Sequence, residues 1–510
     1  MSTIREMVGM LRPNGACARM IALLLTATSL ASCVVGPDYQ KPFLVLPVSW
    51  GNAKQAKPSK PPELAEWWRR LNDPMLDELI QEAVAGNLDV ATSKAKIREA
   101  RATYRQAGGA LLPSVDGAAS ATRSRTASTG TDGASTGNEF QAGFDASWEL
   151  DLFGANRRTV EAARYGMDAA EEELRSTLLT LLGDVASYYV EARGYQARIA
   201  LARRTAASQQ ETAALTRLKF EAGASSAVDV ANAAGQAATT EADIPDLETS
   251  YAEAVHRLSV LTGRPPATLA DRLKKSRPIP RPKLPIPTGI PADTLMTHPD
   301  VRLAERQYAQ YTAKVGEAEA ARYPSVSLTG DVATTGTRIG DLGKGSTISW
   351  SFGPSLSVPI FQGGQLKAAV EIAQAQRDQY FVAYRTAVLT ALEDVENAIV
   401  ALHQERIKSG KLAISVKHYR DAASLGRSLY QSGSQSFLDL LEAERSLYSA
   451  EDSLIQSQVA ITTDYIALNK ALGGGWNGLV DSSRPEIVDV NTGPQLALPS
   501  GQSRPIAMKK

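Results

Sequence analysis

The sequence is poor in the residues that build covalent, metal and acid–base sites. Among 510 residues there are two cysteines, Cys17 and Cys33, and four histidines. Two cysteines are too few for a disulfide framework or a zinc finger, and four scattered histidines leave little for metal binding or proton transfer. No nucleophile–base or metal-ligand spacing supports an enzyme. We therefore expect no catalytic residues, no metal and no cofactor apart from covalent lipid.

Net charge and long apolar runs are also missing. Lys+Arg and Asp+Glu number 55 each, so no positive excess predicts nucleic-acid binding. Beyond residue 33 no run approaches the 18 apolar residues of a transmembrane helix. Aromatic residues make up only 6%, which also argues against a polytopic helical membrane protein, whereas 43% hydrophobic residues suffice for a packed core.

The first 33 residues have the pattern of an export signal. Three arginines precede a short apolar run at residues 20–31, as in a secretory signal peptide. The run ends in Leu-Ala-Ser-Cys at 30–33, which resembles the bacterial lipobox. We expect a signal peptide over 1–32, with diacylglycerol and N-palmitate on Cys33. The alternative is an ordinary signal peptide that contains a cysteine.

The remaining chain contains two copies of one pattern. Asn87-Leu-Asp-Val90 matches His298-Pro-Asp-Val301, and the proline-containing string at 111–115 matches that at 322–326, both at an offset of 211. Further landmarks follow in the same order, so the sequence predicts a tandem duplication. Residues 264–297 between the copies are rich in proline and predict an extended connector.

Each copy contains strands with long alternation. In 140–152 the even positions are apolar or alanine and the odd positions are polar or glycine, and 347–360 alternates in a similar way. We expect strand pairs within about 113–153 and 324–361. Alternation over more than ten residues favours tilted transmembrane strands with one face toward lipid and the other toward a wet lumen. A long hairpin in a soluble sandwich is the alternative. The predicted lumen-facing residues are Asp145, Glu149 and Asp151.

Long helices follow the strands. Residues 155–220 and 365–431 contain no proline, which predicts two helices of about 100 Å each. Leucine or isoleucine recurs every seven residues from Leu440 to Leu468, which indicates coiled-coil packing of the return helix. Four strands cannot close a barrel with a lumen, and open sheet edges cannot face lipid. We therefore expect several chains to share one barrel.

Several strings resemble the outer-membrane factor family, the TolC-like ducts, in its lipidated NodT-type branch. They span about residues 33–476 and are Cys33-Val-Val-Gly-Pro-Asp-Tyr39, Trp67-Trp68, Asp73-Pro-Met-Leu76, Trp148-Glu-Leu-Asp-Leu-Phe-Gly154, Pro359-Ile-Phe361, Ala443-Glu-Arg-Ser-Leu447 and Lys470-Ala-Leu-Gly-Gly-Gly-Trp476. The resemblance implies a mainly α fold with a transmembrane β-barrel. It implies a homotrimer whose twelve-stranded barrel, four strands per chain, continues into a periplasmic coiled-coil barrel.

The resemblance also implies segments and partners. The expected segments are a lipoprotein signal peptide (1–32), a lipidated extended and equatorial segment (33–73), repeat 1 (74–263), a connector (264–297), repeat 2 (298–475) and an equatorial tail (476–510). The implied partners are a periplasmic adaptor protein, an inner-membrane pump of the RND type and outer-membrane lipid, with no nucleic acid. Trp67-Trp68 suggests equatorial packing more than a membrane contact.

The resemblance places a gate and docking tips at the far turns, 221–228 and 431–438. It implies that Asp439 and Glu442, with Asp229 in the first copy, ring the periplasmic opening. The other interpretation is capping, because Ser226–Asp229 and Ser436–Asp439 both have the spacing of a capping box. The expected adaptor-docking residues are Gly223, Ala224, Ser225, Gly433, Ser434 and Gln435. Their glycines equally suit a simple helix reversal.

Gln435 stands where some relatives carry a latch arginine, so Tyr430 or Arg427 are the candidates for that role here. The function that we expect is the exit duct of a tripartite efflux pump for small solutes such as drugs. The alternatives are a duct for secreted polypeptides and a periplasmic coiled-coil scaffold lipoprotein without a pore.

Overall fold

The structure is a computed structural model of the 510-residue chain. It describes residues 34–44, 47, 50–51, 64–127, 134–283, 296–480, 488–489 and 493–494. The predicted signal peptide and Cys33 lie outside the described residues. The chain forms two compact units, each with its own packing. Unit 1 comprises Met1–Pro42, Glu99–Ala169 and Ala304–Tyr384, and unit 2 comprises Phe43–Arg98, Ala170–Leu303 and Arg385–Lys510.

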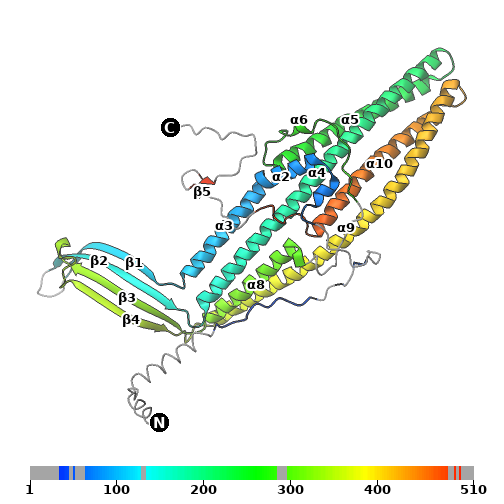
Figure 1. Ribbon diagram of the computed structural model, residues 1–510. Helices are drawn as coiled ribbons and strands as arrows, with labels where there is room; N and C mark the ends of the chain where they lie inside the picture. Colours follow the sequence, from blue (N-terminus) through cyan, green and yellow to red (C-terminus); the bar gives the residue numbers. More distant parts are fainter. Residues whose placement is uncertain are drawn as a thin grey trace, which may run out of the picture. The chain divides into compact units, whose positions relative to one another are not determined.

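The elements repeat in order along the chain (Figure 1). The first half contains η1 (Trp67–Leu71), α2 (Pro74–Gly86), α3 (Leu88–Gly109), β1 (Ser114–Thr126), β2 (Ser135–Leu150), α4 (Ala155–Glu221), α5 (Ala227–Leu261) and α6 (Ala270–Leu273). The second half contains α8 (Pro299–Ala320), β3 (Ser325–Gly336), η2 (Ile339–Asp341), β4 (Ile348–Ser357), α9 (Gln365–Ser432), α10 (Phe437–Ala471), β5 (Val488–Asp489) and β6 (Gly493–Pro494). Thus α3-β1-β2-α4-α5 corresponds to α8-β3-β4-α9-α10. No helix of the described residues is long and apolar enough to cross a membrane.

Unit 1 contains one four-stranded antiparallel sheet, in the order β1-β2-β3-β4. Residues that pair directly across antiparallel strands share a face. Phe144 pairs with Val332, which pairs with Trp350, so these three side chains lie on one face. Trp350 is 76% exposed, and Phe352 on the same face is 70% exposed. One whole face of the sheet therefore presents large apolar side chains without protein cover in the described chain.

The sheet ends on open edges. β1 and β4 are its outer strands, and neither has a strand on its outer side within the described residues. Within lipid, a row of unpaired backbone N–H and C=O groups is stable only when another strand pairs with it, because no water is present to bond those groups. The sheet is therefore a fragment of a larger one.

Unit 2 is built around the tryptophan pair. Trp67 and Trp68 are 1% and 4% exposed and belong to one apolar core with residues of α2, α4, α5, α9 and α10. The hydroxyl of Tyr465 donates to the carbonyl of Trp67 at 2.9 Å, and the hydroxyl of Tyr189 donates to Asp73 at 2.6 Å. The favoured interpretation of Trp67-Trp68 as packing residues is confirmed.

The helices of unit 2 pair antiparallel (Figure 1). Along α4 and α5, Arg203 contacts Glu248 while Gln210 contacts Glu241. Along α9 and α10, Arg420 contacts Glu451 while Arg427 contacts Glu444 at 2.7 Å. In both pairs the residue numbers rise along one helix while those of their partners fall along the other, so the helices run antiparallel. Each long helix therefore packs against its return helix, as the heptads predict.

The segment that follows Cys33 is held against unit 1. Arg158 at the start of α4 is 2% exposed, and its guanidinium donates to the carbonyls of Val35 and Gly36, both at 3.2 Å, and to Asp38 at 2.7 Å. The Val35 N–H donates to the carbonyl of Phe153 at 3.1 Å. These bonds fix the first described residues of the chain to the junction of β2 and α4.

Gly36→Ala is expected to weaken this attachment. Gly36 has a φ of 86°, and an added Cβ would lie 2.4 Å from the Cα of Gly316. Strain of this kind costs about 1–3 kcal/mol, so the thermal unfolding midpoint of the purified protein should fall. Gly108→Ala is the matched control, since nothing lies within 4 Å of its Cβ position. An unchanged midpoint for Gly36→Ala would contradict the contact.

Candidate functional site

The polar face of the sheet carries a row of carboxylates. Asp145 of β2 pairs with Asp116 of β1 on one side and with Asp331 of β3 on the other. Asp331 pairs in turn with Ser351 of β4, whose hydroxyl donates to it. The four side chains share the face opposite Phe144. A sheet with aromatic side chains on one face and a carboxylate row on the other can separate lipid from water.

Only Asp145 of this row was predicted from the sequence. The weaker alternation around Asp116 and Asp331 gave no signal, and the strand register that aligns them is not visible in one sequence. Glu149 is exposed on the same face as Asp145, four residues along β2. Asp145 and Glu149 therefore both lie on the polar face of the sheet, which is the face that a lumen-facing role requires.

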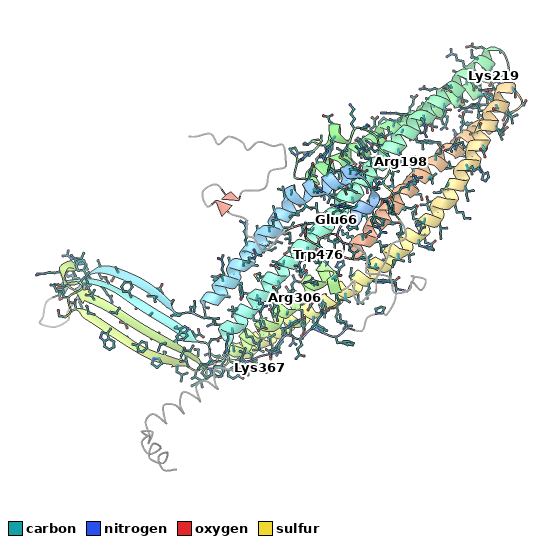
Figure 2. The ribbon with its side chains drawn as sticks, in the orientation of Figure 1. Glu66, Arg198, Lys219, Arg306, Lys367 and Trp476 are labelled. Atoms are coloured by element: carbon teal, nitrogen blue, oxygen red, sulfur yellow. The ribbon has the colours of Figure 1, made fainter. Side chains whose placement is uncertain are left out.

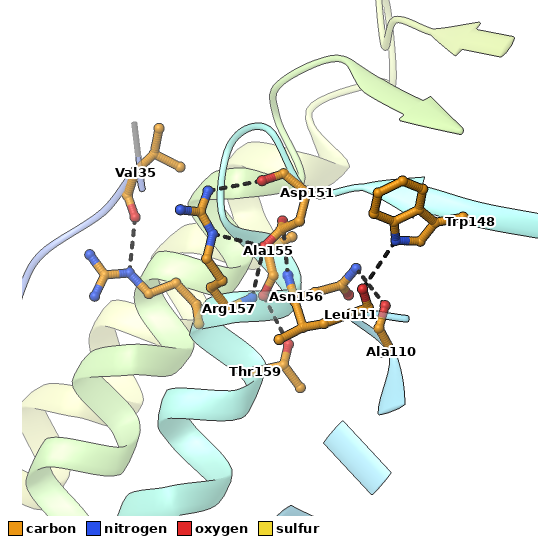
Figure 3. Close-up of polar contacts among 10 residues, drawn as sticks. Val35, Ala110, Leu111, Trp148, Asp151, Ala155, Asn156, Arg157 and Thr159 are labelled. Atoms are coloured by element: carbon orange, nitrogen blue, oxygen red, sulfur yellow. Dashed lines mark hydrogen bonds and ion pairs between the residues drawn. The ribbon is translucent and has the colours of Figure 1, made fainter. Parts of the chain in front are cut away.

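Asp151 is placed differently from the prediction. It follows the last residue of β2, and its carboxylate accepts the N–H groups of Asn156 at 3.2 Å and Arg157 at 2.9 Å (Figure 3). The Arg157 guanidinium also pairs with it at 3.2 Å, and the side chain is 10% exposed. Asp151 thus stabilises the N-terminus of α4 rather than lining a wet face. The alternation over 140–152 extends two residues past the end of β2 at Leu150, because the capping carboxylate of Asp151 fits the polar phase.

Trp148 marks the same junction. Its indole N–H donates to the carbonyl of Leu111 at 3.1 Å, and the side-chain amide of Asn156 donates to the carbonyl of Ala110 (Figure 3). These bonds tie the end of α3 to β2 and α4. The connection between these helix ends and the sheet is therefore hydrogen bonded.

The two tip turns have the same backbone geometry. Gly223 and Gly433 have φ of 73° and 79°. The next residue in each turn, Ala224 or Ser434, donates its N–H to a carbonyl five residues back, at 2.7 and 2.8 Å. This pattern ends a helix and requires glycine at the left-handed position. Both turns are exposed, with Ser225 and Gln435 half-buried behind them.

Asp229 caps α5. Its N–H donates to the Ser226 hydroxyl at 3.1 Å, and its carboxylate accepts the Ser226 N–H at 3.0 Å, which completes a capping box. The hydrogen bond from the Ser226 backbone N–H holds the pKa of Asp229 below its usual value. The capping interpretation is confirmed for this residue.

Asp439 and Glu442 differ from Asp229. The N–H of Asp439 donates to Ser436 at 3.3 Å and its carboxylate accepts the Ser436 hydroxyl at 2.8 Å, so Asp439 also interacts with its cap residue. Both carboxylates are exposed and lie on the first turns of α10. Glu442 has no such capping partner. The start of α10 thus presents two neighbouring exposed carboxylates, whereas Asp229 at the start of α5 is half-buried.

A polar network joins three helices behind the tips. Glu444 of α10 is buried, with its carboxylate 2.7 Å from the Arg427 guanidinium and 3.1 Å from the Thr212 hydroxyl of α4. Arg427 also donates to Ser208 of α4. Sequence reasoning missed Glu444, although a carboxylate midway between the heptad positions 440 and 447 was a usable signal.

Tyr430 forms a second link between α4 and α9. Its hydroxyl donates to the Thr216 hydroxyl at 2.9 Å, and both residues are buried. The Lys219 ammonium lies 4.4 Å from the Tyr430 ring centroid and donates to its carbonyl. Figure 2 shows Lys219 near the end of α4. Gln435 is neutral and cannot form a salt bridge, whereas Arg427 does.

A sheet with a bare apolar face and open edges, joined to long paired helices, defines a protein that completes a membrane channel by assembling with other copies. Comparison with known proteins identifies the family. The profile of the outer membrane efflux protein family matches residues 79–264 and 290–474. The chain belongs to this family, and each match falls within one copy of the repeated element order.

The chain is similar to curated relatives over most of their length. Nodulation protein T of Rhizobium leguminosarum bv. trifolii is 35% identical over 449 residues, 88% of this chain and 96% of the relative. The solvent efflux pump outer membrane protein SrpC of Pseudomonas putida is 31% identical over 469 residues, 90% of this chain and 98% of the relative. The predictions of the family and of an efflux channel rather than an enzyme are confirmed.

Solved structures share the fold. The outer-membrane channel OprN gives a TM-score of 0.82 at 33% identity, covering 87% of this chain and all of that chain. CusC gives a TM-score of 0.76 at 28% identity, with the same coverage of this chain. The predicted fold class, a mainly helical TolC-like outer-membrane channel, is confirmed. The chain is therefore a component of the outer membrane.

Proposed function

We propose that three copies of this chain form a passive duct that carries small solutes from a periplasmic adaptor and an inner-membrane pump to the outside. The observation that supports it is the sheet. Among the described residues no strand pairs with the outer side of β1 or β4, and further copies can pair them while keeping Trp350 toward lipid. Four strands from each of three chains make a closed barrel. The carboxylate row then becomes a belt around its lumen.

The carboxylates at the second tip are proposed to line the periplasmic opening. In a trimer, Asp439 and Glu442 would each form a ring at the end of the helical tube, where fixed negative charge favours cations. Asp229 contributes less, because its carboxylate is already occupied by the Ser226 backbone.

Purified protein reconstituted in planar bilayers should conduct ions, and Asp439→Asn with Glu442→Gln should lower the cation-to-anion permeability ratio severalfold, since it removes both rings. Asp229→Asn is the matched control at the first tip and should change selectivity much less. Absence of conductance in the wild type would contradict the duct. Conductance with unchanged selectivity in the double variant would contradict the gate alone.

We propose that Arg427 and Tyr430 take the place of the latch arginine that Gln435 replaces. Arg427 ties α9 to Glu444 of α10 and Ser208 of α4, and Tyr430 ties α9 to Thr216 of α4. Opening a tube of paired helices requires one pair to move past the other. Bonds that join α4 to both α9 and α10 oppose that movement and so favour the closed state.

The tips are proposed as the docking surface for the adaptor. Gly223-Ala-Ser225 and Gly433-Ser-Gln435 form two exposed turns of the same geometry. Repeated turns of one shape suit repeated contacts with the hairpins of an adaptor. An inner-membrane pump is the proposed energy source, since SrpC and CusC belong by name to a solvent efflux pump and a cation efflux system. The RND type is proposed from the family resemblance of the sequence alone. The polypeptide-secretion and scaffold alternatives have no comparable support.

We propose that Cys33 carries the lipid anchor. The residues that follow it are bound by Arg158 to the base of the sheet, which is where an outer-membrane anchor must start. Labelling cells with radioactive palmitate should mark the wild-type protein, and Cys33→Ser should remove the label completely. Labelling that persists in Cys33→Ser would contradict the site, and Cys17→Ser is the control that should keep it.

A further inference from the structure

A cavity of about 400 Å³ lies in unit 2 between α4, α9 and α10. Its walls are polar where a coiled-coil interface is usually apolar. They include Thr205 and Ser208 of α4, and Ser424 and Ser428 of α9. Volumes in this range are typical of sites for small molecules. The cavity plays no part in the lumen face, the tips or the links made by Tyr430.

Three arginines line this cavity against one carboxylate. Arg427 pairs with Glu444, which is itself part of the wall. Arg420, whose side chain is exposed, pairs with the half-buried Glu451. Arg204 is exposed, and no hydrogen bond or ion pair holds its side chain within the described residues. The lining therefore carries a net positive charge, which favours an anion.

Gln209 gives the second, independent indication. Its side chain lines the cavity and is 2% exposed. Neither its amide nitrogen nor its amide oxygen has a hydrogen-bond partner among the described residues. A buried amide without partners is costly, because both its donors and its acceptor have left water. A ligand that satisfies Gln209 must accept a hydrogen bond from the nitrogen and donate one to the oxygen.

We propose that this cavity binds a phosphate-type anion, with acceptor oxygens for Arg204 and Arg420 and a hydroxyl for the oxygen of Gln209. Arginine guanidinium groups match the oxygens of such anions in pairs. Hydrogen phosphate supplies acceptors and a donor together, whereas sulfate supplies acceptors only. The volume also accommodates a phosphate monoester whose organic part carries hydroxyl groups. Bound between three helices, the anion would stabilise their packing.

Isothermal titration of the purified full-length protein in detergent, with inorganic phosphate, sulfate and glycerol 3-phosphate, tests this site. We expect saturable binding of phosphate and at least tenfold weaker binding of sulfate, since sulfate leaves the Gln209 oxygen unpaired. Tighter binding of glycerol 3-phosphate than of phosphate would identify an ester as the ligand, and the reverse would identify free phosphate. No saturable binding, or equal binding of phosphate and sulfate, would overturn the proposal.

Two neighbouring arginines provide matched variants. Arg204→Gln should weaken phosphate binding about tenfold or more with an unchanged unfolding midpoint, because its side chain is exposed and unpaired in the described chain. Arg203→Gln removes the same charge one residue away, where the side chain contacts Glu248 outside the cavity, and should leave binding unchanged. Equal losses in both variants would show a general charge effect and would overturn the site. Anion binding is measured without conductance, so failure of the anion site and failure of the proposed duct can be told apart.

Discussion

Arg427→Leu is expected to lower the thermal unfolding midpoint and to raise the conductance of the closed channel. Among the described residues, the substitution leaves the carboxylate of Glu444, which is 8% exposed, with the Thr212 hydroxyl as its one partner. Removing one member of a buried pair costs about 3 kcal/mol at the lower end of the usual range, and Arg427 is itself a third exposed. The substitution also removes the bond from α9 to Ser208 of α4 and leaves Tyr430 to hold α9 against α4, which lowers the barrier to opening.

Arg420→Gln is the matched control. Arg420 lies two turns before Arg427 on α9 and contacts Glu451 of α10, but its side chain is 62% exposed. Its partner Glu451 is 17% exposed, and a pair with one exposed member contributes about 1 kcal/mol, so in phosphate-free buffer both the midpoint and the conductance should stay close to the wild type. Arg427→Lys should restore part of the loss, since it keeps the charge without the planar guanidinium. Wild-type behaviour of Arg427→Leu in both measurements would exclude the latch.

Lysine at two adjacent positions of β2 is expected to give opposite results. Phe144→Lys places a charge on the apolar face beside Val332, at a cost of about 2–4 kcal/mol for each chain near the bilayer midplane. Since every protomer carries it, we expect little or no trimer in the outer-membrane fraction. Asp145→Lys places the same charge on the polar face, between Asp116 and Asp331, and should assemble normally.

The two variants are read by separate measurements. Gel filtration in mild detergent reports assembly, and the reversal potential of reconstituted Asp145→Lys reports the loss of cation preference. Because Asp145 lies between two other aspartates, the added ammonium is paired, and the protein should remain about as stable as the wild type. Assembly of Phe144→Lys together with failure of Asp145→Lys would mean that the faces have been assigned the wrong way round.

The architecture was largely predictable because its signals are periodic and long. Alternation over residues 140–152 predicted β2, and a proline-free stretch from 155 predicted α4. The alternation of β2 reflects two faces of different polarity, and the absence of proline allows an uninterrupted helix. Both features can be read from one sequence. The C-terminal end of β2 could not be placed as well from the sequence. Asp151 continued the polar phase, but the backbone had already turned toward α4, where its N–H groups needed an acceptor.

The site was only partly predictable, since contacts between distant segments leave no local period. Asp145 was found, but its neighbours Asp116 and Asp331 depend on the register of three strands. Glu444 and Arg427 are 17 residues apart and meet across an antiparallel helix pair. The partnerless amide of Gln209 is visible only when its surroundings are known, because a glutamine in a helix is otherwise unremarkable.

With the proposed lipid on Cys33, the attachment of Gly36 to Arg158 would also set where the bilayer begins on this molecule. Cys33 stands three residues before Gly36, and three residues of extended chain reach at most about 10 Å. An acylated Cys33 would thus bring the inner leaflet to the level at which β2 passes into α4. The lipid would then limit how far the chain can shift along the bilayer normal, because the short segment between Cys33 and Gly36 cannot extend further.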